Sequence, residues 1–391
     1  MLKEKVCKFI DENRGLFFSV SKEIWENPEV GFEEFKASEL LAKIIQEAQF
    51  DTELGVASLD TAIYALHPDQ KEGPTVAILA EYDALPEIGH GCGHNLIAAA
   101  ALGASLALGS IKKELPGKLV FMGTPAEEGG GGKIFMINAG LFKDVDAAMM
   151  FHPSATKNYV GRGGLAVKEI KIEFFGKTAH ASSEPEKGIN ALDAIIQIFN
   201  GINALRQHIT SDARIHGVIT NGGVKPNIVP GYASAEFYVR AQDDNYCEEL
   251  VNKVENIAKG AALSTGARLE FERVGHAYMS RNVNKVLGAA FTKNMNAIGE
   301  KTHTVEHGKG LGSSDIGNVS HVVPTIHPYI GISKDEINGH STDFAKAASS
   351  EYGNEQMLKI TKALAMTAID VFTTPELVKE MKEDFEKTKK R

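Results

Sequence analysis

The chain has 391 residues, of which 43% are hydrophobic and 24% charged, a balance typical of a folded globular protein with two domains. Its formal net charge of −9 argues against a nucleic-acid partner, because binding to phosphates needs a basic surface. No apolar run is long enough to cross a bilayer, so we expect no membrane partner. The sparse cysteines form no disulfide framework and no signal peptide is visible, so we expect a cytoplasmic protein.

The first part of the chain alternates between helix-like and strand-like segments. Residues 37–50 have apolar side chains at helical spacing. Three apolar runs of strand length follow at 75–83, 118–128 and 146–153, and the Ala/Leu-rich segment 95–110 predicts a buried helix. Because each run is apolar throughout, we predict an α/β fold with a mostly parallel central sheet flanked by helices.

From about residue 166 the pattern changes. Alternating and helical segments follow one another in the order β-α-β-β-α-β, which predicts a ferredoxin-like domain inserted at residues 166–276. Helical and strand-like patterns resume after it and end in a long helical region at 341–372. We therefore predict a discontinuous first domain, residues 1–165 and 277–391.

Each of the three apolar runs ends in side chains that can bind a metal ion or move a proton. These side chains are Glu81, Asp83, Glu127, Glu128 and His152. Ligands of open α/β sheets bind outside the carboxyl ends of the strands, so we predict that these groups share one crevice.

Cys92 and His94 lie on a glycine-flanked loop after the first run. A thiolate and an imidazole two residues apart can bind one cation, and together they suit zinc. The spacing alone is weak support, because buried Cys and His are more often packing residues. Adjacent carboxylates such as Glu127 and Glu128 can divide the work, one holding a metal ion and the other taking a proton from water there. A solvated pair that caps a turn is the commoner interpretation of two adjacent glutamates.

Several other polar residues are weaker candidates. His152 closes the third apolar run, and His340 precedes the last helical region in a Gly-containing loop. In two loops of the inserted domain, His180 and Asn227 could donate hydrogen bonds to an oxyanion or a carboxylate, although ordinary loop polarity also explains them. We expect surface or packing roles for His90, His208, His216, His276, His303, His307 and His321.

The glycine run GGGGK at 129–133 does not fit a phosphate-binding loop. Glu127 would stand at the position of the first glycine that the motif requires. Ile134 follows the lysine, where the motif requires Ser or Thr. We expect these glycines to let the backbone pass close to a metal ion or substrate.

Together these motifs resemble those of the zinc-dependent aminoacylase/carboxypeptidase G family of metallopeptidases (clan MH), and in particular its amidohydrolase branch. The resemblance extends from the N-terminal helix to His340 and so covers nearly the whole chain. The segments that carry it are, in order, NPEVGFEE, EYDALP, GHGCGHN, GTPAEEGGGGK, MMFHP, GKTAHASSEPEKGINAL, GGVKPNIVP and NGHSTDF.

The resemblance implies a catalytic domain with two divalent metal ions, zinc or manganese, and an inserted lid domain that forms a homodimer, with a tetramer compatible. It implies that Cys92 bridges the two ions, that Glu127 is the general base and later the acid, and that His180 and Asn227 reach the substrate from the lid. The metal ligands that it implies are Cys92, His94, Glu128, His152 and His340.

The sequence departs from the family pattern at two positions. Many relatives have His-x-Asp where this chain has Glu81-Tyr82-Asp83, and we expect that Glu81 does not replace that histidine as a ligand. The branch often has Asp where Asn95 follows His94, which leaves open the partner that orients the His94 ring. The role of Asp83 is also open, and a place behind the metal ligands is one option.

We predict metal-dependent hydrolysis of an amide or peptide bond in a small substrate, such as a dipeptide, a short peptide or an N-acyl amino acid. A carboxylate next to the cleaved bond is the expected recognition handle. One alternative is a thiol hydrolase with Cys92 as nucleophile, which leaves Glu127, Glu128, His152 and His340 without roles. Another alternative is a non-catalytic peptide-binding or sensor protein. The absence of some metal ligands would favour it, but all five implied ligands are present in this sequence.

Overall fold

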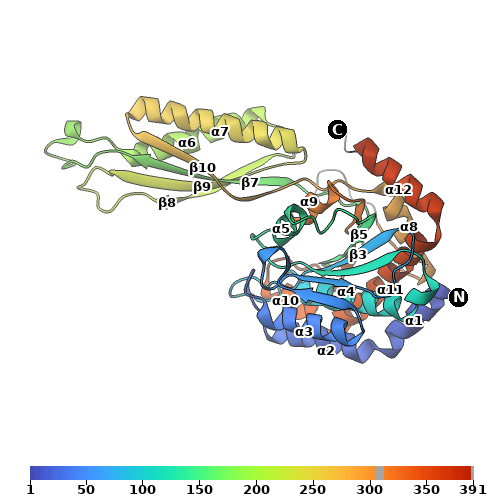
Figure 1. Cartoon of the computed structure of the whole chain (residues 1–391). Helices are drawn as coiled ribbons and strands as arrows, with labels where there is room; N and C mark the ends of the chain where they lie inside the picture. Colours follow the sequence, from blue (N-terminus) through green and yellow to red (C-terminus); the bar gives the residue numbers. More distant parts are fainter. Residues whose placement is uncertain (304–311, 389–391) are drawn as a thin grey trace. The chain divides into compact units, whose positions relative to one another are not determined.

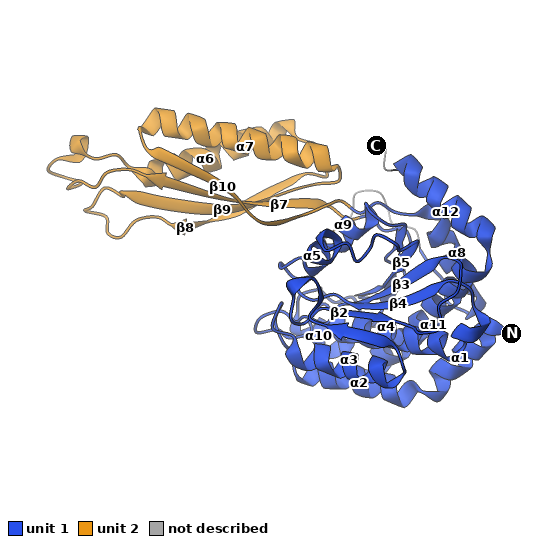
Figure 2. Ribbon diagram, viewed as in Figure 1, with its two compact units in different colours: residues 1–163, 281–307, 314–391 blue, residues 164–280, 308–313 orange. Residues whose placement is uncertain are grey.

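The computed structural model describes residues 1–303 and 312–388, which divide into two compact units (Figures 1 and 2). Unit 2 consists of residues 164–280 with 312–313, and unit 1 contains the remaining described residues on either side. Each unit has a hydrophobic core of its own. The predicted insertion at 166–276 lies inside unit 2.

Unit 1 is built around a six-stranded sheet with the order β1-β2-β4-β3-β5-β11. Its strands are β1 (Asp51–Leu54), β2 (Ile63–Leu66), β3 (Thr75–Ala80), β4 (Lys118–Gly123), β5 (Ala147–Met149) and β11 (Thr325–Ile326). The pairs β3–β4, β3–β5 and β5–β11 are parallel, and β1 and β2 extend one edge with antiparallel pairing. The predicted mostly parallel sheet is therefore confirmed, and β3 is buried along its whole length, as expected for an apolar run without alternation.

Helix α4 (His94–Ser110) explains the Ala/Leu-rich segment. It packs against β3 and β4 on one side and against α1 (Leu2–Glu12), α2 (Arg14–Glu26) and α11 (Glu351–Thr373) on its other sides. A helix enclosed in this way needs apolar side chains all around. The other helices of unit 1 are α3 (Phe35–Glu47), α5 (Gly132–Asn138), α8 (Lys285–Ala297), α9 (Ile316–Ser320), α10 (Thr342–Ala348) and α12 (Pro375–Thr388).

The third apolar run differs from the prediction, because it forms two strands. It begins in β5, and His152 opens β6 (His152–Ser154), which pairs in parallel with β12 (Tyr329–Gly331) in a separate two-stranded sheet. His152 therefore starts a strand and does not close one. The ring of His152 lies 5.9 Å from that of His94, between ring centroids.

Unit 2 is a four-stranded antiparallel sheet with two helices on one face (Figure 1). Its elements are β7 (Ala166–Phe175), α6 (Ala191–Leu205), β8 (Arg214–Asn221), β9 (Tyr232–Ala241), α7 (Asp244–Thr265) and β10 (Arg268–Tyr278). The strand order β10-β7-β9-β8 confirms the predicted ferredoxin-like β-α-β-β-α-β arrangement. Strand β8 forms one edge of this sheet. Across the described residues of both units, every helix is too short or too polar to span a bilayer.

Candidate metal centre

Unit 1 brings the five implied metal ligands together. Their ligand atoms form two groups of three, and within each group all atoms lie within 4.8 Å of one another. One group is Cys92, His94 and His152, and the other is Cys92, Glu128 and His340. Cys92 belongs to both groups, which is the arrangement that a thiolate bridging two cations requires.

Two unusual backbone positions allow these residues to converge. Gly93 has a φ of +74°, and a Cβ on it would lie 2.8 Å from Cγ of Pro153, so only glycine lets the start of α4 approach β6 so closely. His340 has a φ of +55°, and its N–H donates to the carbonyl of Gly91 at 3.1 Å. A left-handed non-glycine residue costs free energy and is typical of functional loops.

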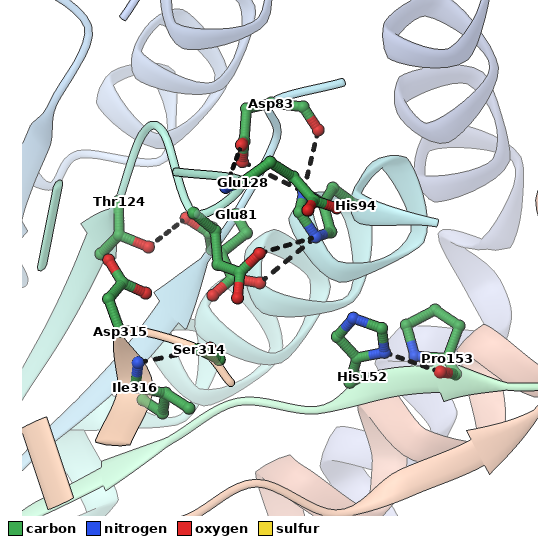
Figure 3. A network of polar contacts seen from close by, with 12 residues as sticks. Glu81, Asp83, His94, Thr124, Glu128, His152, Pro153, Ser314, Asp315 and Ile316 are labelled. Atoms are coloured by element: carbon green, nitrogen blue, oxygen red, sulfur yellow. Dashed lines mark hydrogen bonds and ion pairs between the residues drawn. The ribbon is translucent and has the colours of Figure 1, made fainter. Parts of the chain in front are cut away.

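The ring of His94 is held by Asp83 (Figure 3). Its Nδ1 lies 2.8 Å from the backbone oxygen of Asp83 and 3.0 Å from Oδ1, so Nδ1 carries the hydrogen and donates it. Oδ2 of Asp83 accepts the backbone N–H of Glu128 at 2.9 Å. Asn95 instead donates to Ser21 and to the carbonyl of Ala348, so Asp83 and not Asn95 is the hydrogen-bond partner of the ring.

This hydrogen bonding leaves Nε2 of His94 directed at acidic groups. Oε2 of Glu81 lies 3.7 Å away (Figure 3). Oε2 of Glu127 lies 3.9 Å away. Burial disfavours a charge on His94, but the carboxylate of Asp83 outweighs it and raises the pKa of the ring well above its usual range. Burial and the carboxylates of Glu128 and Glu81 raise the pKa of Glu127 well above its ordinary value. The site therefore attracts positive charge.

The donor set fits divalent cations. Nε2 of His94 and Oε1 of Glu128 are buried and make no hydrogen bond within the described part of the chain, and such atoms are rare without a ligand. Oε1 of Glu128 lies 3.8 Å from Nε2 of His340. Desolvation lowers the pKa of His152 to about 3, so its ring is neutral, the form that binds metals. Thiol, imidazole and carboxylate ligands together suit zinc.

The glycine run after Glu128 has a further structural reason. A Cβ on Gly130 would lie 2.5 Å from Cβ of Ala126, and one on Gly132 would lie 2.1 Å from the carbonyl oxygen of Pro125. These glycines let the turn fold back on the residues just before Glu127. A side chain at either position would therefore disturb the turn that carries Glu127 and Glu128.

Two residues to which the sequence motifs gave no role also belong to this region. His327 is buried, its ring centroid lies 5.7 Å from that of His152, and neither of its ring nitrogens makes a hydrogen bond within the described residues. Glu34 belongs to the NPEVGFEE segment, and its Oε1 accepts the N–H of Ala126 at 2.8 Å while Oε2 accepts the hydroxyl of Thr61 at 2.8 Å. Glu34 thus holds the turn that carries Glu127.

The pKa of Glu34 gives a testable pH dependence. Burial, followed by the nearby Asp83, raises its pKa to about 7. Between the unfolded value and this one, the folded protein keeps a proton that the unfolded chain loses, so stability falls as pH rises through roughly 4.5 to 7. We expect Glu34→Gln, which resembles the protonated form, to remove a stability loss of roughly 3 kcal/mol across this window. Urea unfolding at several pH values measures it; an unchanged pH dependence in the variant would contradict this role.

The two implied substrate-binding residues belong to unit 2. His180 pairs with Ile228 in a β-bridge, and the N–H of Ala181 donates to the carbonyl of Asn227 at 3.0 Å, so the two loops lie side by side there. Both side chains are exposed. Their action on a substrate held in unit 1 stays a prediction.

Most of the remaining histidines have the expected surface or packing positions. His90 is buried, with Nε2 3.0 Å from the carbonyl of Ile24, and His321 is half-buried. His307 lies outside the described residues. The exposed members are His208, His216, His276 and His303.

Unit 1 is an α/β unit whose strand ends gather nitrogen, sulfur and oxygen donors, and it is joined to a ferredoxin-like unit. This is the architecture of a metal-dependent hydrolase. Residues 162–265 match the peptidase dimerisation domain of the M20 peptidases, and the chain belongs to the M20 peptidase family. It is 40% identical to the Xaa-Arg dipeptidase of Mus musculus over 98% of this chain and 92% of the relative.

Two solved structures show the same fold. A candidate aminohydrolase from methicillin-resistant Staphylococcus aureus superposes with a TM-score of 0.82 at 18% identity. The superposition covers 95% of this chain and 100% of the other chain. A dinuclear metal-binding M20 peptidase from Bacillus subtilis superposes with a TM-score of 0.70 at 21% identity, over 92% and 99% of the two chains.

Proposed function

We propose that this protein is a dinuclear metallopeptidase that hydrolyses the amide bond of a dipeptide or an N-acyl amino acid. The observation that carries the proposal is the sharing of Cys92 by two ligand groups, with Glu127 directly beside Glu128. The similarity to a dinuclear metal-binding peptidase of B. subtilis and to a dipeptidase of the mouse supports it. We propose zinc as the metal, because thiolate and imidazole are ligands that zinc favours.

In this mechanism the side chains of the protein would hold the metal ions and transfer protons next to them. Two divalent cations would lower the pKa of water and polarise the amide carbonyl. Glu127 takes a proton from the attacking water and then protonates the leaving nitrogen. Asp83 keeps the His94 ring in the orientation that presents Nε2. His180 and Asn227 donate hydrogen bonds to the oxyanion or to the substrate carboxylate.

A substrate panel tests this function. The purified protein, with its metal content measured, is offered Xaa-Arg dipeptides, other dipeptides and N-acyl amino acids, and the released amino acid is quantified. We expect cleavage that stops on chelation and returns with Zn²⁺ or Mn²⁺. Full metal occupancy with tight peptide binding and no cleavage of any panel member would favour the non-catalytic sensor instead.

The thiol-hydrolase alternative finds no support in the structure. Burial raises the pKa of the Cys92 thiol, whereas a nucleophilic cysteine needs a lowered pKa and access to substrate. Cys92 is 8% exposed and belongs to both ligand groups. A free thiol with a metal-binding role also fits a reducing compartment, so we propose a cytoplasmic location.

We further propose that unit 2 mediates homodimer formation through the outer edge of β8. The match to a peptidase dimerisation domain supports this proposal. On β8, Val218 is 62% exposed and Ile219 is 45% exposed, and an exposed apolar edge strand is a surface for strand pairing.

We expect Val218→Lys to weaken the dimer about tenfold, because an apolar contact is lost and two like charges meet. Sedimentation over a concentration series measures the shift. Leu263→Lys, at an apolar side chain on α7 that is 87% exposed, is the control and should leave the dimer intact. A Val218→Lys protein with wild-type dimer affinity would rule out this edge.

A further inference from the structure

Beside the metal ligands, unit 1 contains a buried lysine with two acidic partners. Lys133 follows the glycine run at the start of α5, and its side chain is 0% exposed. Its ammonium lies 2.7 Å from Oδ1 of Asp315 and 2.5 Å from Oε1 of Glu81, and both acids are fully buried. The backbone N–H of Lys133 donates to Oδ2 of Asp315 at 3.0 Å, so Asp315 binds the lysine at two points.

This arrangement leaves one oxygen of Glu81 free. Oε2 of Glu81 is buried and makes no hydrogen bond within the described residues, and it lies 3.7 Å from Nε2 of His94, which likewise makes none. With metal–ligand bonds of about 2.0–2.2 Å, atoms that share one ion lie roughly 3–4 Å apart. Figure 3 shows the carboxylate of Glu81 directed at the His94 ring.

We propose that Lys133 and Asp315 are positioning residues for the metal centre. They clamp one oxygen of Glu81 and thereby aim the other at the ion that His94 binds, so that they control the affinity and the ligand geometry of that ion without contacting it. This inference rests on the proposed metal centre. It assigns Glu81 a place at the ion, contrary to what the comparison with His-x-Asp relatives suggested.

The charges of the cluster make the lysine necessary. Carboxylate oxygens of Glu81, Glu127 and Asp315 lie within 4.8 Å of one another, a set that could itself hold a cation. Lys133 already supplies the positive charge between Glu81 and Asp315. The lysine therefore keeps a stray cation out of these acids and leaves Glu127 available for substrate chemistry.

The test uses the full-length protein loaded with Co²⁺, whose visible spectrum reports its ligands. The double variant Lys133→Met/Asp315→Asn removes the clamp without leaving a single buried charge at these positions. We expect its Co²⁺ affinity, measured by competition with a chelator, to fall about 10–100-fold and its absorption bands to shift. Wild-type affinity and spectrum in a folded double variant would overturn the proposal.

Two further variants complete the test. If the double variant does not fold, Glu81→Gln replaces it; the same loss is expected, and a wild-type spectrum with wild-type affinity overturns the proposal. Lys112→Met is the matched control, because Lys112 is also buried but its ammonium donates to backbone carbonyls, including that of Gly117 at 2.8 Å. It should lower stability and leave the Co²⁺ spectrum unchanged. If the wild-type protein itself binds no Co²⁺, the result contradicts the proposed metal centre as a whole, and not only the positioning role of Lys133 and Asp315.

Discussion

Replacing Glu127 by Gln is expected to lower kcat by about 10²–10⁴-fold while both metal ions stay bound. The substitution keeps the size of the side chain and removes its ability to accept a proton. Glu127 is 7% exposed and faces Nε2 of His94 at 3.9 Å, so it lies where a water at the ions would be activated. Steady-state kinetics on the best dipeptide, with metal content measured on the same sample, checks the prediction.

The neighbouring glutamate provides the matched control for this experiment. Glu128 belongs to a ligand group with Cys92 and His340, so Glu128→Gln should lower the metal content as well as turnover. The two adjacent substitutions therefore separate the loss of a base from the loss of a ligand. Turnover near the wild-type level in a fully loaded Glu127→Gln protein would show that another group is the base.

Replacing Cys92 by Ala is expected to remove both metal ions and to lower turnover at least about 10³-fold. The reason is that Cys92 belongs to both ligand groups, so its loss weakens two sites at once, whereas the loss of His152 or His340 affects one. Metal per chain, measured by elemental analysis after gel filtration, checks the prediction. A Cys92→Ala protein that keeps two ions and its activity would contradict the bridging role.

Cys247 supplies the control for this substitution. It is also buried and free, but it lies in unit 2, where its thiol donates to the carbonyl of Val239 at 3.3 Å. Cys247→Ala should cost about 1 kcal/mol of stability and leave metal content unchanged. The comparison separates the removal of a buried thiol as such from the removal of a metal ligand.

Much of the fold could be predicted from local patterns. The uninterrupted apolar run that becomes β3 indicates a strand buried on both faces, and the β-α-β-β-α-β order of unit 2 is visible in its changing periodicity. The break between β5 and β6 could not be predicted, because both pieces are apolar and the break depends on which strands they pair with. Periodicity does not encode pairing partners.

The candidate site was predictable only in part, for a similar reason. The ends of β3 and β4 bring Glu81, Asp83, Glu127 and Glu128 close together, as expected at the carboxyl ends of neighbouring parallel strands. The ligand roles came from a resemblance to a family. The contact between Lys133 and Asp315 joins residues 182 positions apart, and that between Ala126 and Glu34 joins residues 92 apart. A single sequence carries no signal for such pairs.

The most direct test of the dinuclear centre is a crystal structure with anomalous diffraction recorded at the absorption edge of the bound metal. We expect two anomalous peaks on either side of Sγ of Cys92, one next to His94 and His152 and the other next to Glu128 and His340. A single peak, or ions bound away from Cys92 in a protein that still cleaves its substrate, would contradict a thiolate-bridged metal pair as the catalytic centre.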